Sequence, residues 1–282
     1  MSNIDPKTVA GFGCEWVRFD QSGASIQELE RTWRDYFHLF PWDSLPTAAE
    51  GFDLGCGSGR WAKFVAPRVR KLHCIDASSE ALNVARCNLA EFANCVFHHA
   101  SVDEIPLGDG SMDFGYSLGV LHHLPDAVAG MRTCVAKLKP GAPFIVYLYY
   151  ALDNRPTWFR ILWRLSDAVR RVISNLPHFL RYRVAEIIAI VLYLPLARLA
   201  RIAQSVGVNA DLLPLAAYRE RSFYTMRTDA LDRFGTRLER RFTKHEIRKM
   251  MEDCGLERIE FSDRIFWGAI GYKRLNGAHK AT

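Results

Sequence analysis

The chain of 282 residues is long enough for one large domain, or for one domain that carries a sizeable insertion. Its composition, 49% apolar and 24% charged, is typical of a globular protein with an ample core. The seven cysteines are scattered without a Cys-x-x-Cys pair, which argues against a disulfide framework and a zinc site and favours a reducing compartment. The N-terminus lacks the basic start and apolar run of a signal peptide, so a cytoplasmic protein is expected.

The net charge of +6 is concentrated in one segment. Between Arg155 and Arg201 there are nine arginines and two acids, Asp167 and Glu186, so the segment carries +7 and the rest of the chain −1. Because the basic charge belongs to this segment alone, the composition does not by itself indicate a nucleic-acid-binding protein.

In chain order, the first predicted element is an amphipathic helix over residues 24–40, where apolar side chains recur at helical spacing. From residue 49 to residue 150 strand candidates alternate with helices such as Ser79–Phe92, which is typical of a parallel sheet wrapped by helices. The strand candidates are Glu50–Leu54, Lys71–Ile75, Cys95–His99, Asp113–Leu118 and Pro143–Tyr149.

The alternation stops after residue 150 and resumes near the C-terminus. Thr243 and Glu246 form a predicted capping box that opens a helix ending at Gly255. Glu257–Ser262 and Phe266–Lys273 are the last two strand candidates. The predicted organisation has four parts. Residues 1–48 form an N-terminal helical segment that covers the site, and residues 49–150 form a Rossmann-like core. Residues 151–227 form a helical insertion, and residues 228–282 complete the sheet.

The stretch DLGCGSGR, Asp53 to Arg60, has glycines at alternate positions. Dinucleotide-binding loops need Gly-x-Gly-x-x-Gly, and here Arg60 occupies the place of the third glycine. Asp53 would repel a pyrophosphate but would support a cationic ligand. Asp76 follows at the end of the second predicted strand, where a carboxylate can accept hydrogen bonds from ribose hydroxyls. The pattern therefore predicts an adenosyl ligand that is cationic and lacks phosphates.

Residues 50–150 resemble a class I S-adenosylmethionine-dependent methyltransferase of the small-molecule type. The matching motifs are the glycine loop at 53–59, the acid in CIDAS at 74–78, SVDEIPLGDGSMDFGYSLGVLHHLPD at 101–126 and LKPGAPFIVYLY at 138–149. The resemblance implies an α/β fold, a Rossmann-like seven-stranded methyltransferase sheet whose last strand is antiparallel, with the helical insertion after its fifth strand.

The resemblance also implies which residues bind S-adenosyl-L-methionine. The backbone at Gly55, Gly57 and Gly59 would contact the methionine part of the cofactor, with Asp53 near the same end. Asp76 would bind the ribose. The residues implied near the adenine are Ala77, Ser101 and Val102, and Leu118 is a further implied cofactor-binding residue. Many members of this family carry an aspartate at the position of Ser101. An aspartate accepts a stronger hydrogen bond from the adenine amino group than the Ser101 hydroxyl does.

Two histidines, His122 and His123, follow the fourth predicted strand at the edge where open α/β sheets bind ligands. His123 is the first candidate for a general base and His122 the second, and helix capping or a backbone hydrogen bond is the structural alternative. Candidate acceptor-contacting residues, chosen by position, are Trp16, Arg18, Tyr149 and Tyr150. No cluster of potential ligands has metal-binding spacing, so no metal is expected.

The insertion contains a predicted amphipathic helix, Trp158–Ile173. Its apolar stripe is Trp158, Leu162, Leu165, Val169 and Val172, and its polar stripe is Arg160, Arg164, Asp167 and Arg171. The favoured interpretation packs the apolar stripe on the protein and leaves the charges in solvent, as a lid over a hydrophobic acceptor. The alternative is a helix that contacts an anionic membrane, through the region 155–201. The apolar run 187–197 is too short for a membrane span, which needs about 20 residues.

The predicted function is methyl transfer from S-adenosylmethionine to an oxygen, or secondarily a nitrogen, of a small or hydrophobic acceptor. Methylation of a membrane lipid or quinone and a non-catalytic cofactor-binding module are the alternatives. A nicotinamide oxidoreductase is disfavoured by Arg60. A nucleic-acid methyltransferase is disfavoured because SLGV follows the fourth strand, where a base-gripping Asn-Pro-Pro-Tyr-like loop would be needed. The sequence leaves the oligomeric state open.

Overall fold

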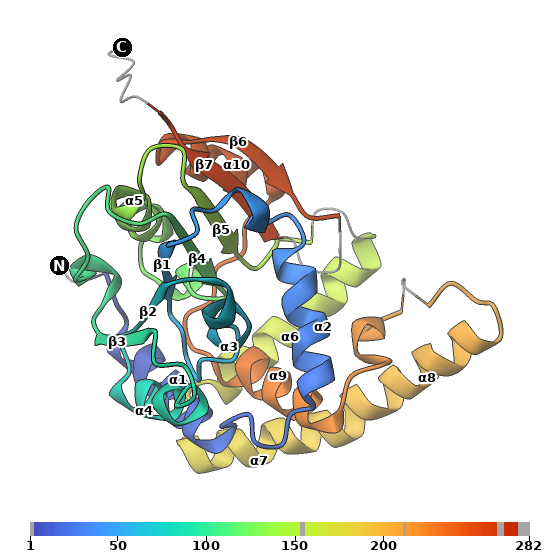
Figure 1. The fold of residues 1–282 in the computed structure, drawn as a ribbon. Coiled ribbons are helices and arrows are strands. Elements are labelled where there is room, and N and C mark those ends of the chain that lie inside the picture. The colour runs from blue at the N-terminus through green and yellow to red at the C-terminus, as the bar shows by residue number, and fades with distance from the viewer. Residues whose placement is uncertain (1–2, 153–155, 211–212, 264–267, 276–282) are drawn as a thin grey trace. The chain divides into compact units, whose positions relative to one another are not determined.

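A computed structural model describes residues 3–152, 156–210, 213–263 and 268–275 (Figure 1). The chain divides into two compact units. The first unit comprises residues 1–17, 30–151 and 238–282, and the second comprises residues 18–29 and 152–237. The second unit thus extends further than the segment 151–227 predicted from the sequence, and it includes a piece of the N-terminal segment.

The first unit is built on a seven-stranded sheet with the order β3-β2-β1-β4-β5-β7-β6. The strands are β1 (Glu50–Leu54), β2 (Lys71–Asp76), β3 (Cys95–His99), β4 (Phe114–Leu118), β5 (Pro143–Tyr147), β6 (Leu256–Phe261) and β7 (Gly268–Lys273). Strands β1 to β5 pair in parallel, and β7 is antiparallel to both of its neighbours. This order confirms the predicted methyltransferase sheet. Residues 266 and 267 of the last predicted strand lie outside the described residues.

Helices cover both faces of this sheet (Figure 1). The helical elements of the first unit are α1 (Pro6–Arg18), α2 (Ile26–Phe37), η1 (Trp42–Ser44), α3 (Ala62–Val65), η2 (Ala66–Arg68), α4 (Ser79–Asn88), η3 (Val102–Glu104), η4 (Leu121–His123), α5 (Ala127–Lys137) and α10 (Lys244–Asp253), although the ends of α1 and α2 fall in the second unit. Local chemistry sets where several of them begin, because Ser78 and Asp126 cap α4 and α5. The predicted capping box of Thr243 and Glu246 is confirmed at α10.

Two hydrophobic clusters form the core of the first unit. One contains Phe52 and Phe144 of the sheet with Met131 of α5 and Met251 of α10. The other contains Leu72, Phe114 and Tyr116 of the sheet with Trp33 and Phe37 of α2 and Leu82 of α4. Strand β4 is buried along its whole length, as expected for a central parallel strand that has helices on both faces. The core therefore holds the carboxyl ends of β1 and β4 in fixed positions.

The second unit is helical. Its elements are α6 (Thr157–Ile173), α7 (His178–Ile188), η5 (Ala189–Tyr193), α8 (Leu194–Ser205), η7 (Ala216–Tyr218) and α9 (Phe223–Gly235). Helices α7 and α8 continue into each other through η5 (Figure 1). Ile173, Tyr193, Met226, Ala230 and Phe234 form its main apolar cluster. In the part of the chain that the structure describes, no helix is long and apolar enough to cross a membrane.

Helix α6 buries two charged residues and exposes its predicted apolar stripe within the second unit. Its buried side chains include Asp167 and Arg170, which pair at 2.7 Å between Oδ1 and Nε. The five residues of the predicted apolar stripe are instead 46–68% exposed. Within this unit the stripe therefore does not pack inward, and its packing on the sheet-containing unit stays a prediction. Helical periodicity located the stripe correctly, but burial depends on the partners that each face meets, and Arg170 finds backbone carbonyls inside the second unit at Thr236 and Arg237.

The chain leaves and re-enters the first unit at adjacent positions. Tyr150 forms a bridge with Phe242, and the amide of Ala151 donates to the Phe242 carbonyl at 2.8 Å. The amide of Phe242 in turn donates to the Tyr149 carbonyl at 2.9 Å. These bonds hold the segment that follows Arg237 beside the end of β5.

Candidate active site

The candidate site lies where the strand order reverses. Strand β1 is paired with β2 on one side and with β4 on the other. From β1 the chain adds β2 and β3 toward one edge of the sheet, and it then adds β4 and β5 toward the other edge. Ligands of open α/β sheets bind at the carboxyl ends of the strands that flank such a reversal. Here the β1 strand leads into the glycine loop, and β4 leads into Gly119 and the two histidines.

The glycine loop needs glycine for its backbone conformation and also for packing. Gly55, Gly57 and Gly59 have φ angles of +74°, +54° and +76°, in the left-handed region that favours glycine. A Cβ atom at Gly57 would stand 2.8 Å from Nε1 of Trp16, and one at Gly59 would stand 2.8 Å from Leu89. The protein's own side chains therefore occupy the side of the loop from which Cβ atoms are missing.

Asp76 connects the end of β2 to the glycine loop. Its Oδ2 accepts from the Gly57 amide at 2.9 Å, and its Oδ1 accepts from the Ser78 amide at 2.8 Å. Burial raises the pKa of the Asp76 carboxyl, and these two backbone N–H groups partly offset the rise. A carboxylate offers about four acceptor positions, so it can accept a further hydrogen bond. The side chain is only partly buried and can be reached by a ligand.

Asp53, at the other end of the loop, is a buried carboxyl whose charge is poorly compensated. Burial raises its pKa to about 8, although the nearby Tyr116 hydroxyl favours the charged form. Asp53 Oδ2 and the Tyr116 hydroxyl have no hydrogen-bond partner of normal geometry among the described residues. The same holds for the Ser58 hydroxyl, which is wholly buried. A buried acceptor of this kind costs free energy unless a ligand supplies a donor.

The four other residues implied to bind the cofactor lie on three different segments. Ala77 follows β2, and its carbonyl accepts from His99 Nε2 at 3.0 Å. Ser101 directly precedes η3 and is partly exposed, whereas Val102 is buried in the core. Leu118 ends β4 and is buried. Ser101 and Val102 follow β3, and β3, β2, β1 and β4 are consecutive in the sheet, so all four residues lie at the carboxyl ends of parallel strands.

Helix α1 contributes two aromatic side chains that lie one turn apart. Phe12 contacts His123, with ring centroids 4.9 Å apart. Trp16 lies against Gly57, and the Arg60 guanidinium stands 4.9 Å from its ring. Trp16 was predicted to contact the acceptor, and the structure places it at the glycine loop. Phe12 was missed, although its i, i+4 spacing from Trp16 indicates one helix face.

His123 is held in one tautomer. Its Nδ1 lies 2.6 Å from the Leu238 carbonyl oxygen, which can only accept a hydrogen bond. In the neutral ring Nδ1 therefore carries the proton, and Nε2 has the lone pair. Leu238 is 115 residues away in the sequence, so this partner could not be predicted from local patterns. The arrangement is that of a general base oriented by a second group.

His122 has a different environment. Its ring is wholly buried and stacks on Tyr149, with centroids 3.9 Å apart. Burial, with His123 and Arg241 nearby, holds the pKa of His122 well below its ordinary value. Neither ring nitrogen has a hydrogen-bond partner among the described residues. This histidine is therefore neutral and forms part of the wall beside His123.

The segment after Arg237 adds a buried ion pair to the site. Glu239 and Arg241 pair at 2.8 Å, and the Arg241 guanidinium lies 5.1 Å from the centre of the Tyr149 ring. Arg241 also donates to the Tyr150 carbonyl at 3.3 Å. The Tyr149 ring thus contacts both histidine rings and the Arg241 guanidinium, whereas Tyr150 contacts Arg241 through its backbone carbonyl. The sequence pattern contains no signal that identifies Glu239 or Arg241.

Arg18 is the one predicted acceptor residue that belongs to the second unit. Its guanidinium lies 5.1 Å from the centre of the Tyr182 ring in the same unit. Trp16, Tyr149 and Tyr150 belong to the first unit together with the histidines. The structure therefore brings three of the four predicted acceptor residues into the unit that carries the glycine loop.

The residues present fit S-adenosylmethionine. The orphaned Asp53 oxygen is suited to a cationic group, and the accessible Asp76 carboxylate has room for the hydrogen bonds of a ribose. A Cβ atom at Gly119 would meet nothing within 4 Å, so there is open space beside the loop after β4. The donor set therefore agrees with a cofactor that is positively charged at one end and carries an adenosine.

Comparison with known proteins gives the same class. Residues 52–146 match a protein family described as a methyltransferase domain. A ubiquinone biosynthesis O-methyltransferase of Sodalis glossinidius is 28% identical over 180 residues, which cover 60% of this chain and 69% of that protein. A protein of the same name from Aromatoleum aromaticum is 34% identical over 105 residues, covering 36% of this chain and 43% of the relative. The two alignments thus cover 69% and 43% of the length of these relatives.

Solved structures show a similar fold at low sequence identity. An S-adenosylmethionine-dependent methyltransferase of Methanosarcina mazei superposes with a TM-score of 0.50 at 17% identity and covers 83% of this chain and 96% of its own. A methyltransferase of Haloferax volcanii, solved with the activator Trm112, also gives 0.50, at 14% identity, covering 93% and 97% of the two chains. At these identities the likeness concerns the fold alone.

Proposed function

We propose that this chain, whose residues 52–146 match a methyltransferase domain, methylates a hydroxyl oxygen of a small, hydrophobic aromatic acceptor, such as a catechol or a quinol. The observation that carries this proposal is the fixed tautomer of His123, whose Nδ1–H donates to Leu238 and whose Nε2 is therefore the proton acceptor. A neutral hydroxyl needs such a base when it becomes a nucleophile.

The bound cofactor supplies an electrophilic methyl carbon on a positively charged sulfur. The acceptor oxygen would bond to this carbon, and the electron pair of the broken carbon–sulfur bond would remain on the sulfur. Nε2 of His123 takes the proton that the hydroxyl loses. The chain must therefore hold the hydroxyl close to His123 and in line with the methyl group, about 3–3.5 Å from it.

The side chains around His123 favour a flat apolar acceptor. Phe12, His122 and Tyr149 place three rings beside it, with centroid distances of 4.9, 4.0 and 5.8 Å. His122 is neutral because of its lowered pKa, so it adds an apolar surface and no charge. Aromatic rings pack well against another aromatic ring. The relatives named as ubiquinone biosynthesis O-methyltransferases support the same acceptor class.

We assign cofactor contacts to the glycine loop, to Asp53 and to Asp76. Asp53 would lie near the positive charge of the methionine part, and Asp76 would accept from the ribose. Trp16, which covers Gly57, would shield the methionine part from water. The second unit would contribute to the choice of acceptor, because the chain leaves β5 and returns at Phe242 beside the residues that surround Tyr149.

The test is a screen of catechols, hydroquinones and amines of matched size with the methyl-labelled cofactor, read by mass spectrometry. We expect the label on an oxygen of at least one phenolic acceptor, with His123→Ala strongly reduced. A label found only on nitrogen would contradict O-methylation. Tight cofactor binding with no transfer to any acceptor class would instead favour a non-catalytic module.

A further inference from the structure

The second unit exposes an apolar surface on one side of helix α6. The exposed residues at helical spacing are Trp158, Ile161, Leu162, Leu165, Val169 and Val172. Over the 17 residues of α6 this stripe is about 25 Å long. A contiguous exposed apolar patch of this kind usually marks an interaction surface.

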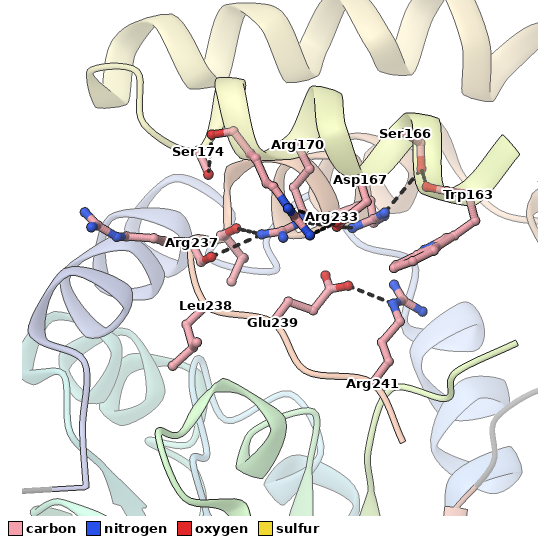
Figure 2. A network of polar contacts seen from close by, with 12 residues as sticks. Trp163, Ser166, Asp167, Arg170, Ser174, Arg233, Arg237, Leu238, Glu239 and Arg241 are labelled. Carbon is pink, nitrogen blue, oxygen red and sulfur yellow. Dashed lines mark hydrogen bonds and ion pairs between the residues drawn. The ribbon is translucent and has the colours of Figure 1, made fainter. Parts of the chain in front are cut away.

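Polar contacts on the opposite side prevent the stripe from turning inward. Arg170 donates to the carbonyls of Thr236 and Arg237 at 2.9 and 3.1 Å, and it pairs with Asp167 (Figure 2). Arg233 of α9 reaches the Ser166 hydroxyl at 3.2 Å and lies 3.7 Å from Asp167. Rotation of α6 would leave these buried charges without partners, which costs several kcal/mol. The apolar face is therefore the outer face of α6 within this unit.

The exposed charges of residues 156–209, which include α6, have one sign. Six exposed arginines lie between residues 156 and 209, and they are Arg160, Arg164, Arg171, Arg183, Arg198 and Arg201. The two acids of this described stretch are Asp167, which is buried and paired, and Glu186, which is partly buried and pairs with Arg227. Ile161 and Arg164 are neighbours at i, i+3 spacing, so cationic side chains border the apolar stripe.

We propose that α6 is a membrane-docking helix that lies on the surface of an anionic phospholipid bilayer. An apolar stripe bordered by arginines is the pattern of helices that insert their apolar side among the headgroups while their cations meet lipid phosphates. A protein partner would need a complementary acidic surface of its own, whereas an anionic bilayer supplies both the apolar layer and the negative charge. Exposed apolar residues on the following helices, Phe179, Ile187, Val191, Leu199 and Ile202, add to the surface available for docking.

This inference does not depend on the acceptor. It would, however, place the enzyme where a hydrophobic quinol dissolves. Binding to vesicles can be measured without any methyl transfer, and methyl transfer to a water-soluble catechol can be measured without vesicles. Failure of the docking proposal and failure of the proposed reaction are therefore distinguishable.

The test is co-sedimentation of the full chain with vesicles of phosphatidylglycerol and phosphatidylcholine in equal parts, against phosphatidylcholine alone. We expect binding to the anionic vesicles that weakens strongly between about 0.05 and 0.5 M salt, because screening shortens the range of exposed charges. The triple variant Leu165→Ser, Val169→Ser, Val172→Ser should bind roughly tenfold or more weakly. The matched control is Leu275→Ser, since Leu165 and Leu275 are 62% and 67% exposed and Leu275 lies in the first unit.

A second pair of variants tests the charge. Arg160→Gln with Arg164→Gln should weaken vesicle binding by roughly tenfold, and Arg70→Gln with Arg132→Gln, which removes two exposed arginines of the first unit, should not. Absence of vesicle binding by the intact chain at low salt would overturn the proposal. So would a stable dimer that the triple serine variant dissociates, because the stripe would then be an interface between copies. Calorimetric binding of the cofactor by each variant shows that it is folded.

Discussion

At the scale of single residues, the two adjacent histidines have different environments. The ring of His123 is oriented by Leu238, whereas His122 is buried and neutral. We expect His123→Ala to lower kcat by about 10²–10⁴ while cofactor affinity stays nearly unchanged, since the base acts only on the acceptor. His122→Phe keeps a flat ring on Tyr149 and should retain most of the activity.

Steady-state kinetics measures kcat of both variants, and calorimetry measures their affinity for the cofactor. Equal losses of kcat in both variants would contradict the assignment of the base to His123. If neither variant loses activity, positioning of the acceptor is the main source of catalysis, and the histidines serve packing.

Asp53 predicts a pH dependence of stability. Its folded-state pKa of about 8 lies above the ordinary value of about 3.9, so between these values the folded protein holds a proton that the unfolded chain has lost. Stability of the cofactor-free protein should therefore fall as pH rises across this window and level off above it. Asp53→Asn removes the titration and should be more stable than the wild type at pH 8, by about 2 kcal/mol or more.

Urea unfolding of both proteins across the same pH window, without cofactor, measures this difference. The two curves should converge toward the acid end, where Asp53 is protonated in both states. Parallel curves across the whole range would show that Asp53 is charged in the folded protein, and that another group compensates it.

At the scale of an element, the orientation of α6 depends on one carboxylate. Burial by itself would raise the pKa of Asp167, but its hydrogen bond to Arg170 and the charges of Arg170, Arg233 and Arg171 hold that pKa below its ordinary value. This contribution to stability is present above about pH 4 and is lost as pH falls through the lowered pKa. We expect Asp167→Asn to destabilise the second unit by about 3–5 kcal/mol, because Arg170 stays buried without its counter-ion.

The matched control is Asp253→Asn, which breaks the exposed pair with Lys249 on α10. An exposed pair contributes at most about 1 kcal/mol. Hydrogen exchange read by mass spectrometry should show faster exchange in the peptides of α6 and α9 for Asp167→Asn alone. Unchanged exchange in these peptides would mean that apolar contacts, not the ion pair, fix the orientation of α6.

At the scale of the whole molecule, the two units should separate cofactor binding from acceptor choice. The glycine loop, Asp76 and His123 all belong to the first unit, and the chain leaves and returns at hydrogen-bonded positions, Ala151 and Phe242. A variant in which a flexible linker replaces residues 156–234 keeps Leu238 and the ion pair of Glu239 and Arg241. We expect cofactor affinity within a few fold of the wild type, because the cofactor contacts are unaffected, and loss of methylation of the native acceptor.

Calorimetry with S-adenosylhomocysteine and an acceptor assay measure the two properties. The control is the same linker inserted after Gly207 in the intact chain, between α8 and η7, which removes no helix. Loss of cofactor binding in a variant whose sheet remains folded would refute this division of roles.

Much of the fold and part of the site could be predicted because local patterns carry them. The strands of the sheet follow from runs of apolar residues, and the capping box of α10 depends on side chains three residues apart. The glycine loop has a backbone conformation that other residues rarely adopt, so its position is visible in the sequence. These features also identify the cofactor class.

The remaining features depend on contacts between distant parts of the chain. The sequence by itself determined the methyltransferase sheet, the glycine loop with its two acids and the amphipathic pattern of α6. Only the tertiary structure decided that Leu238 orients His123 and that α6 buries Asp167 and Arg170, because the partners of His123 and Arg170 lie 115 and 66 residues away. Periodicity identifies the faces of a helix, but which face is buried depends on whether the protein supplies partners for its charges, as Thr236 does for Arg170.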